Sequence, residues 1–212
     1  MKCLDLYSGL GGFSEAFAIS KKWEVMRLEN NTLLENVAHT EIIDVIDFRD
    51  ELKKMIAEGY VPEKVDCVLA SPPCLEFSNG FSAPKSIHVR EHGSLDNYKP
   101  DMKFLQAAID IIEMLKPRYW IIENVWGATR YFNPKLGEPT QIIDAFCLWG
   151  NFPFIHLTKK LPLKKEKDKR HSPLRSNYLA QIPLALSSAI LTAIETQKTV
   201  FDYLIDENYP LL

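Results

Sequence analysis

The chain has 212 residues, of which 46% are hydrophobic, and its formal net charge is -3. This size suits one domain with a core of its own and argues against two independent domains. The charge excludes a generally polycationic nucleic-acid binder, so any contact with phosphates must be local.

Secretion and membrane insertion have no signature in the sequence. The N-terminus shows no basic segment followed by an apolar run, and no apolar stretch approaches the roughly 20 residues that cross a bilayer. We therefore expect a soluble, cytoplasmic protein with no membrane partner. The four cysteines form no Cys-x-x-Cys pair and do not cluster with the five histidines, so we expect neither a disulfide framework nor a metal site.

The first predicted strand, residues 2–7, leads through a glycine-rich loop into a helical pattern over residues 13–19. The loop contains Gly9, Gly11 and Gly12. Glycine has no side chain and tolerates positive φ, so a cofactor could approach the backbone closely here. A tight turn without a ligand is the alternative interpretation.

A second predicted strand, residues 23–28, ends on Glu29. A carboxylate at this place is suited to accept hydrogen bonds from ribose hydroxyls, as in nicotinamide and S-adenosylmethionine enzymes. A dinucleotide-binding loop would want a third Gly or Ala where this chain has Ser14, which disfavours a nicotinamide enzyme without excluding it. The loop and Glu29 together indicate a nucleoside-containing cofactor.

The next predicted elements are a strand over 42–46, a helix over 48–58 and a strand over 65–70. The last of these runs into Ser71-Pro72-Pro73-Cys74, where two prolines forbid continuation as a central strand. A lone cysteine is more often a small buried hydrophobe than a nucleophile. Cys74 differs because it follows a stiff turn at a strand end, a setting that would hold a thiolate in place.

Residues 80–100 are polar and aperiodic and predict a long loop, of the kind that is functional or disordered. A helix is predicted over 101–115 and a strand over 119–122, which ends on Glu123-Asn124. Glu123 could simply cap the following turn. Beside a nucleophilic Cys74, however, such an acid could hydrogen-bond a ring nitrogen that accumulates charge.

Two more helices are predicted, over 140–148 and 183–196. The alternation of strands and helices predicts an α/β fold with a doubly wound, mainly parallel sheet. Ligands in such folds sit at the carboxyl ends of the strands, so the glycine loop, the Pro-Pro-Cys turn and Glu123 should gather on one edge. A lysine-rich segment within about 157–177 is a candidate phosphate contact or a solvated loop.

Three segments resemble motifs of the cytosine-C5 DNA methyltransferase family, and they occur in the family's order. These are residues 5–13 (DLYSGLGGF), residues 71–78 (SPPCLEFS) and residues 123–125 (ENV). The resemblance covers roughly residues 1 to 130. It implies a Rossmann-like methyltransferase fold, with S-adenosylmethionine as cofactor and S-adenosylhomocysteine as its product.

The resemblance also implies roles for individual residues. In the family's reaction Cys74 would attack C6 of cytosine, Glu123 would bind N3 and the exocyclic amine, and C5 would take the methyl group. The target base would be rotated out of the duplex. The implied catalytic residues are Cys74, Glu123, Pro73 and Asn124. The implied cofactor-binding residues are Asp5, Tyr7, Ser8, Gly9, Gly11, Gly12, Phe13, Glu29, Asn30, Asp44, Val45 and Pro72. The implied substrate contacts are Ser71, Ser78, Arg90, Arg170 and Arg175.

The chain departs from the family pattern in one region. Family members usually carry a target-recognition domain before the last helix, whereas here only about 30 residues, 151–180, occupy that interval. The family's Gln-x-Arg-x-Arg motif is not evident, and Arg170 and Arg175 are the candidates to supply one of its cations. Compact, phage-like relatives have an ending that residues 182–187 (IPLALS) resemble. We therefore expect one catalytic domain over 1–212, with a basic loop at about 157–177.

DNA is the expected substrate and partner, in a restriction-modification or phage setting, with a separate specificity subunit or a second copy of the chain as further candidate partners. The short recognition region keeps two alternatives open. One is cytosine-C5 methylation of RNA or free nucleotide. The other is a catalytically silent module that binds cofactor or DNA.

Overall fold

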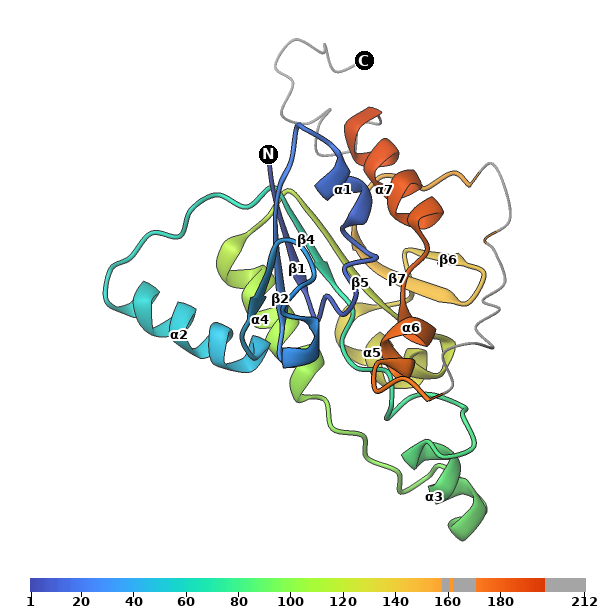
Figure 1. Ribbon diagram of the computed structural model, residues 1–212. Coiled ribbons are helices and arrows are strands. Elements are labelled where there is room, and N and C mark those ends of the chain that lie inside the picture. Colours follow the sequence, from blue (N-terminus) through green and yellow to red (C-terminus); the bar gives the residue numbers. More distant parts are fainter. Residues whose placement is uncertain (158–160, 162–170, 197–212) are drawn as a thin grey trace, which may run out of the picture.

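The computed structural model describes residues 1–157, 161 and 171–196. Its centre is one seven-stranded sheet with the order β3-β2-β1-β4-β5-β7-β6 (Figure 1). The first five strands in this order run parallel, while β7 is antiparallel to both β5 and β6. The strands are β1 (Lys2–Leu6), β2 (Glu24–Glu29), β3 (Thr40–Ile42), β4 (Cys67–Ala70), β5 (Tyr119–Val125), β6 (Gln141–Ile143) and β7 (Phe146–Asn151).

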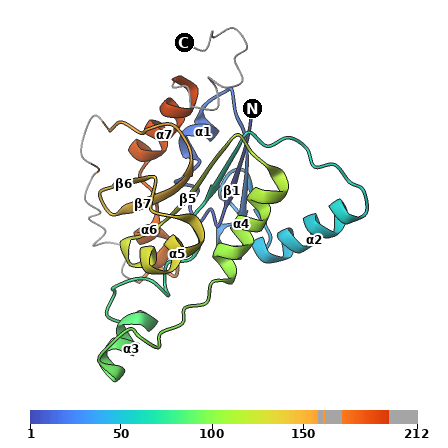
Figure 2. The same ribbon diagram turned by 180° about the vertical axis from the view of Figure 1, so that it is seen from behind.

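Helices cover both faces of the sheet, as Figures 1 and 2 show from opposite sides. Helices α1 and α7 pack together on one face, and α2 and α4 pack together on the other. The helices are α1 (Glu15–Ile19), α2 (Val45–Ala57), α3 (Pro84–His92), α4 (Lys103–Leu115), α5 (Thr129–Leu136), α6 (Arg175–Ala180) and α7 (Leu184–Thr196), with 3-10 turns η1 (Thr32–Leu34) and η2 (Trp126–Ala128). The predicted doubly wound α/β fold is confirmed.

The alternation of side chains along each strand divides the core in two. On β4, Cys67 and Leu69 belong to the cluster beneath α1 and α7, whereas Val68 and Ala70 belong to the cluster beneath α4. All four side chains are fully buried. A strand covered on both faces must be apolar throughout, which is why 65–70 reads as an unbroken apolar run.

The helix predicted over 140–148 is wrong, because this segment forms the hairpin of β6 and β7. Asp144 lies in the two-residue turn with φ of 52°, a left-handed conformation that aspartate tolerates better than most residues. A short apolar run suits a helix or a strand equally. Pairing with β5 decides for the strand.

Two further predictions need correction. The strand predicted over 42–46 ends at Ile42, because Asp44 accepts a hydrogen bond from the Ile46 N–H (2.7 Å) and caps α2. The predicted loop 80–100 contains α3, which begins at Pro84 and ends at Gly93 in a left-handed conformation. Helix α3 projects away from the sheet on an arm (Figures 1 and 2).

No helix among the described residues combines the length and the apolar character that a membrane span requires. Of the basic segment at about 157–177, residues 158–160 and 162–170, Arg170 among them, lie outside the described part of the chain.

Candidate active site at the carboxyl edge of the sheet

Four parallel strands bring the predicted site residues to one edge. The glycine loop follows β1, Glu29 ends β2, the Pro-Pro-Cys turn follows β4, and Glu123 lies near the end of β5. These strands are neighbours in the order β2-β1-β4-β5, and parallel strands present their carboxyl ends on the same side. Segments more than 100 residues apart in sequence therefore meet here.

The glycine loop is held in place by Glu29. One carboxylate oxygen accepts from the Gly9 N–H at 2.8 Å, and the other accepts from the Asn31 N–H at 2.9 Å. Tyr7, Gly9 and Gly11 all have positive φ, of 60°, 54° and 75°. Each oxygen of a carboxylate can accept more than one hydrogen bond, so Glu29 keeps capacity for ligand hydroxyls.

A buried charged network lies under this loop, and the sequence analysis missed it. The guanidinium of Arg27 donates to the Ser14 hydroxyl (2.8 Å), to the Gly11 carbonyl (3.0 Å) and to the carboxylate of Glu15 (2.9 Å). The Ser14 hydroxyl in turn donates to Asp5 at 2.6 Å. The available signal was an arginine inside the apolar strand β2, since buried charges are paired.

Asp5 is completely buried in this network. Burial raises the pKa of its carboxyl to about 6, against the opposing effects of the Ser14 hydrogen bond and the Arg27 charge. One of its oxygens has no hydrogen-bond partner among the described residues. Asp5 thus helps to hold the loop in place through its hydrogen bond with Ser14.

Helix α7 packs against the end of the same loop and against α1. The buried Ser187 hydroxyl donates to the Phe13 carbonyl (2.7 Å) and accepts from the Ala16 N–H (3.0 Å). A Cβ on Gly12 would collide with the Ile182 carbonyl just before α7. The role of Ser187 was also missed; a serine on the apolar face of a predicted helix was the only sign.

Asn30 and Asp44 lie together beside the loop. The Asn30 amide donates to the Asp44 carboxylate at 3.0 Å, while Asp44 also caps α2. Val45, the first residue of α2, is buried. The two polar residues therefore lie together at the ends of β2 and β3.

The Pro-Pro-Cys turn and the Glu-Asn-Val segment are joined directly. The buried Asn124 side chain donates to the Pro72 carbonyl at 2.8 Å, across 52 positions of sequence. The Cys74 carbonyl accepts from the N–H groups of Phe77 and Ser78, which closes a tight turn. Asn124 thereby sets the turn that carries Cys74 against the strand that carries Glu123.

The four cysteines differ in exposure. Cys3, Cys67 and Cys147 are buried, whereas Cys74 is partly exposed. Burial raises the pKa of Cys147, and the neighbouring Glu123 charge adds to this effect. Of the four thiols, Cys74 has the access to solvent that a nucleophile needs.

The described residues at this edge fit a bound cofactor. The hydroxyl oxygens of Ser8 and Ser71 are buried, directly after β1 and β4, and neither has a hydrogen-bond partner within the described residues. Buried polar groups normally have partners, so a ligand that lies across these two strand ends would satisfy them. Within the same residues, no cluster of His, Cys, Asp and Glu is arranged to hold a metal ion.

The predicted substrate-contact residues do not gather at one place. Ser78 accepts from the Gly80 N–H, and Pro73 is exposed on the turn. Arg90 lies on α3, where it donates to the Phe81 carbonyl (2.7 Å), and the exposed Arg175 opens α6. Arg90 and Arg175 are therefore carried by separate elements outside the sheet.

Three known proteins are similar to this chain over more than half of its length. A "Probable DNA (cytosine-5)-methyltransferase" of Frog virus 3 (isolate Goorha) is 27% identical over 159 residues, which cover 71% of this chain and 66% of the relative. The type II methyltransferase M.HindV of Haemophilus influenzae is 28% identical over 134 residues (59% and 38%). The DNA (cytosine-5)-methyltransferase PliMCI of Paracentrotus lividus is 23% identical over 145 residues (62% and 8%).

The chain spans less than two thirds of the length of each of these relatives. The family model for C-5 cytosine-specific DNA methylase matches residues 1–143, which include the glycine loop, the Pro-Pro-Cys turn and the Glu-Asn-Val segment. With two thirds of its residues matched in this way, the chain belongs to the C-5 cytosine-specific DNA methylase family.

Proposed function

We propose that this chain transfers a methyl group from S-adenosylmethionine to C5 of cytosine in DNA, with Cys74 as the nucleophile. The observation that carries this proposal is the Asn124–Pro72 hydrogen bond, because it fixes the Cys74 turn beside the end of β5, where Glu123 lies. Thiolate and carboxyl are the two groups that addition to a pyrimidine ring requires.

The cofactor would lie across the ends of β1, β2 and β4. Glu29 would accept from its ribose hydroxyls, the Asn30–Asp44 pair would border its adenine, and the unpartnered Ser8 and Ser71 hydroxyls would find partners. The remaining cofactor-binding residues of the proposal lie in three places. Asp5, Tyr7, Gly9, Gly11, Gly12 and Phe13 belong to β1 and the glycine loop, Val45 begins α2, and Pro72 lies in the turn after β4. Bound there, S-adenosylmethionine supplies an electrophilic methyl group.

The protein groups act on the cytosine. The Cys74 thiolate forms a bond to C6, and the electron pair of the C5–C6 double bond becomes available at C5. Glu123 hydrogen-bonds N3 and so stabilises the charge that moves toward it. After C5 has gained its methyl group, loss of the C5 proton restores the double bond and releases the thiolate.

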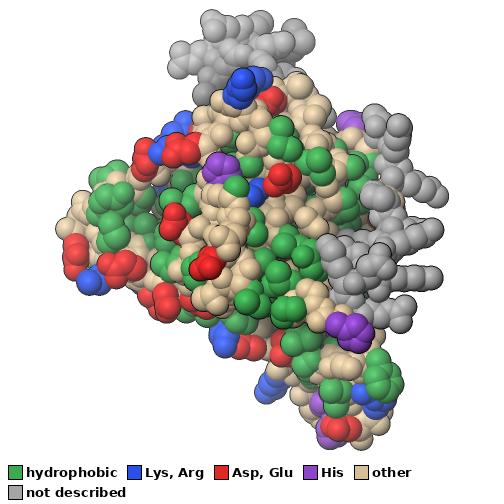
Figure 3. Space-filling model, in the orientation of Figure 1, with side chains coloured by type: hydrophobic (Ala, Val, Ile, Leu, Met, Phe, Trp, Pro, Cys, Tyr) green, Lys and Arg blue, Asp and Glu red, His purple; other side chains and the backbone are tan. Residues whose placement is uncertain are grey.

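Exposed apolar side chains border this edge and suit contact with an extruded base. Leu75 and Trp126 follow the two catalytic segments and are 62% and 63% exposed. Figure 3 shows hydrophobic side chains gathered on the lower part of the visible face, above the α3 arm. Exposed apolar and aromatic side chains offer contacts to a base that has left the stack.

Trapping on DNA that contains 5-fluorocytosine tests the proposal, because fluorine at C5 cannot leave as a proton and the covalent adduct persists. We expect an adduct with the wild type and none with C74S, while C67A, which alters a buried cysteine of β4, keeps the adduct. An adduct with C74S would refute the assignment. Methyl transfer to tRNA or dCMP but not to duplex DNA would replace DNA as the substrate.

A further inference from the structure

Tyr98 lies at the base of the α3 arm, where the chain returns from α3 toward α4. Its hydroxyl donates to the Glu76 carboxylate at 2.6 Å and lies 2.9 Å from the Glu76 carbonyl, so that one proton is shared between two acceptors of the same residue. The shorter distance is typical of a charge-assisted O–H···O⁻ hydrogen bond, which is the stronger kind. These contacts join positions 22 residues apart and close the arm at its base.

The Tyr98 side chain is packed as well as hydrogen-bonded. Its ring lies 5.3 Å from the His88 ring of α3 and 6.1 Å from the Tyr131 ring of α5, measured between ring centres. Burial raises the pKa of the Tyr98 hydroxyl, and the hydrogen bond to Glu76 and the charge of that residue raise it further. The phenol therefore keeps its proton and remains a donor to Glu76.

Glu76 belongs to the turn that carries Cys74. The Cys74 carbonyl accepts from the Phe77 N–H at 3.0 Å, and the Phe77 side chain is buried in the core. On the other side of Cys74, the Asn124 amide donates to the Pro72 carbonyl. The turn is thus fixed at Pro72 and at Phe77, and Glu76 adds a point of attachment on the side of the arm.

The segment that carries Tyr98 is itself attached to the sheet. Helix α4 begins at Lys103, shortly after Tyr98. In the first turn of α4, the Phe104 carbonyl accepts from the Tyr7 hydroxyl at 2.8 Å, and the two rings meet edge to face with their centres 5.9 Å apart. The support that Tyr98 gives to Glu76 is therefore anchored beside the glycine loop.

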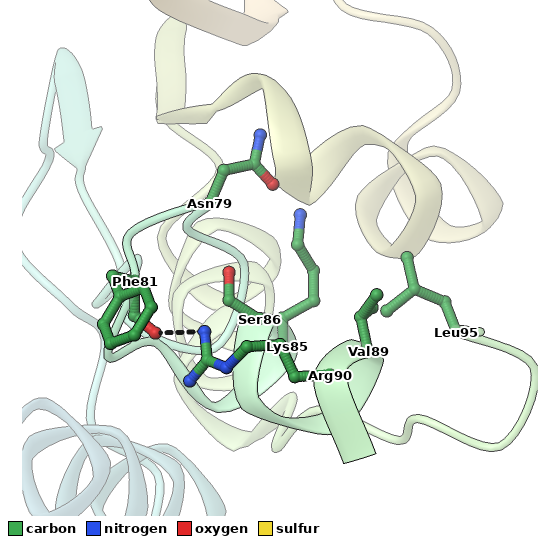
Figure 4. Close-up of a pocket in the computed structure, with 7 residues that line it drawn as sticks. All are labelled: Asn79, Phe81, Lys85, Ser86, Val89, Arg90 and Leu95. Carbon is green, nitrogen blue, oxygen red and sulfur yellow. Dashed lines mark hydrogen bonds between the residues drawn. The ribbon is translucent and has the colours of Figure 1, made fainter. Parts of the chain in front are cut away.

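The arm beyond Tyr98 is less closely packed. A pocket of about 440 Å³ lies between α3 and the loop that precedes it (Figure 4). Phe81, which lines this pocket, is 80% exposed, and the Arg90 guanidinium joins the loop to α3 by donating to the Phe81 carbonyl at 2.7 Å. A segment with few buried contacts opens more readily than a closely packed one. The base of the arm is therefore better suited than its tip to hold the Cys74 turn.

We propose that Tyr98 is a positioning residue for Cys74. Its hydroxyl holds Glu76, and through Glu76 the turn that carries the nucleophile, so that a displacement of α3 leaves the thiol in place. A misplacement of reacting groups by about 1 Å can cost about 100-fold in rate. The inference rests on the proposed function only for what Cys74 does, because the attachment of the turn does not depend on the reaction.

Methyl transfer by the full chain to duplex DNA tests this role. Y98F removes only the hydroxyl, and we expect kcat to fall about 10- to 100-fold while the KM for DNA and the affinity for S-adenosylhomocysteine stay unchanged. Y131F is the matched control and should keep its kcat, because it removes a hydroxyl of the same aromatic cluster that has no hydrogen-bond partner among the described residues. Equal kcat values for Y98F and Y131F, or a rise in KM without a fall in kcat, would overturn the proposal.

A double-mutant cycle tests whether Tyr98 acts through Glu76. E76A should lower kcat by a factor similar to that of Y98F. The double variant Y98F/E76A should lose no more than either single variant, because both substitutions remove one shared interaction. Losses that multiply in the double variant would show that the two side chains act separately, which contradicts the proposal.

Hydrogen exchange gives a readout that needs no activity. The Phe77 N–H should exchange faster in Y98F than in the wild type, whereas the Gly11 N–H, which donates to the Ser8 carbonyl at 2.8 Å, should keep its rate. Unchanged exchange at Phe77, or an equal acceleration at Gly11, would overturn the proposal. If the wild type transfers no methyl group but Phe77 alone responds to Y98F, the proposed function fails and the attachment of the turn by Tyr98 stands.

Discussion

The glycine loop and the α3 arm lie at the same end of the sheet but are built in opposite ways. The loop rests on buried groups: Arg27 is 2% exposed, and its guanidinium donates to Gly11, Ser14 and Glu15 at the loop and to the Ala38 carbonyl. The arm carries Phe81 at 80% exposure. The first region is held by buried hydrogen bonds within the chain, although the Ser8 hydroxyl has no partner among the described residues, whereas few side-chain hydrogen bonds hold the second.

This contrast has a physical basis. A cofactor site gains affinity when its backbone is already ordered, because less conformational entropy is lost on binding. A segment that must admit a large substrate is better held by few contacts, such as the hydrogen bonds from the Tyr98 hydroxyl to Glu76. Three predictions test whether the glycine loop is held more firmly than other parts of the chain.

The largest expected effect is that of R27M. It removes the guanidinium and leaves Asp5 and Glu15 without their cation, which should cost about 3–5 kcal/mol of unfolding free energy, measured in urea. The control is R49M, since Arg49 is half-buried and pairs with Asp50 and Asp110 on and beside α2. This control should cost about 1 kcal/mol or less. Equal losses would show that the network under the loop is no stronger than an ordinary surface pair.

The second prediction concerns the pH dependence of stability. The pKa of Asp5 rises from 3.8 in the unfolded chain to about 6 in the fold. The folded state therefore keeps its proton to higher pH, and the free energy of unfolding falls by about 3 kcal/mol as pH rises from about 4 to above 6. In D5N this contribution is absent. Between pH 4 and pH 8, the unfolding free energy of the wild type should therefore fall relative to that of D5N. A difference between the two proteins that does not change with pH would contradict the assignment.

The smallest effect is expected from the same substitution made in both regions. G12A places a Cβ against the Ile182 carbonyl and 2.9 Å from the Gln181 side chain, so it should cost about 1–3 kcal/mol and weaken binding of S-adenosylhomocysteine. G80A meets only the Ser78 hydroxyl, at 3.3 Å. Calorimetric titration of both variants should show weaker binding in G12A alone. A loss of similar size in G80A would mean that the arm is as tightly built as the loop.

The sequence was sufficient to predict much of the site, but not the buried residues that hold it in place. Gly9, Glu29 and Cys74 were predicted to meet because each directly follows a strand pattern, and parallel strands share an edge. Ser187 was not, because its partners, the Phe13 carbonyl and the Ala16 N–H, lie more than 170 residues away. The hairpin over 141–151 was mistaken for a helix because a short apolar run has no decisive period.

By itself, the sequence determined the alternation of strands and helices, the parallel sheet and the residues at its carboxyl edge. These features follow from the spacing of apolar residues and from glycine and proline, each of which acts on a few neighbouring residues. Only the tertiary structure decided that Arg27 supports the glycine loop, that Asn124 joins the Pro-Pro-Cys turn to β5, and that Lys85 is mostly buried. Each of these depends on contacts between segments distant in sequence, and burial is what makes such contacts strong.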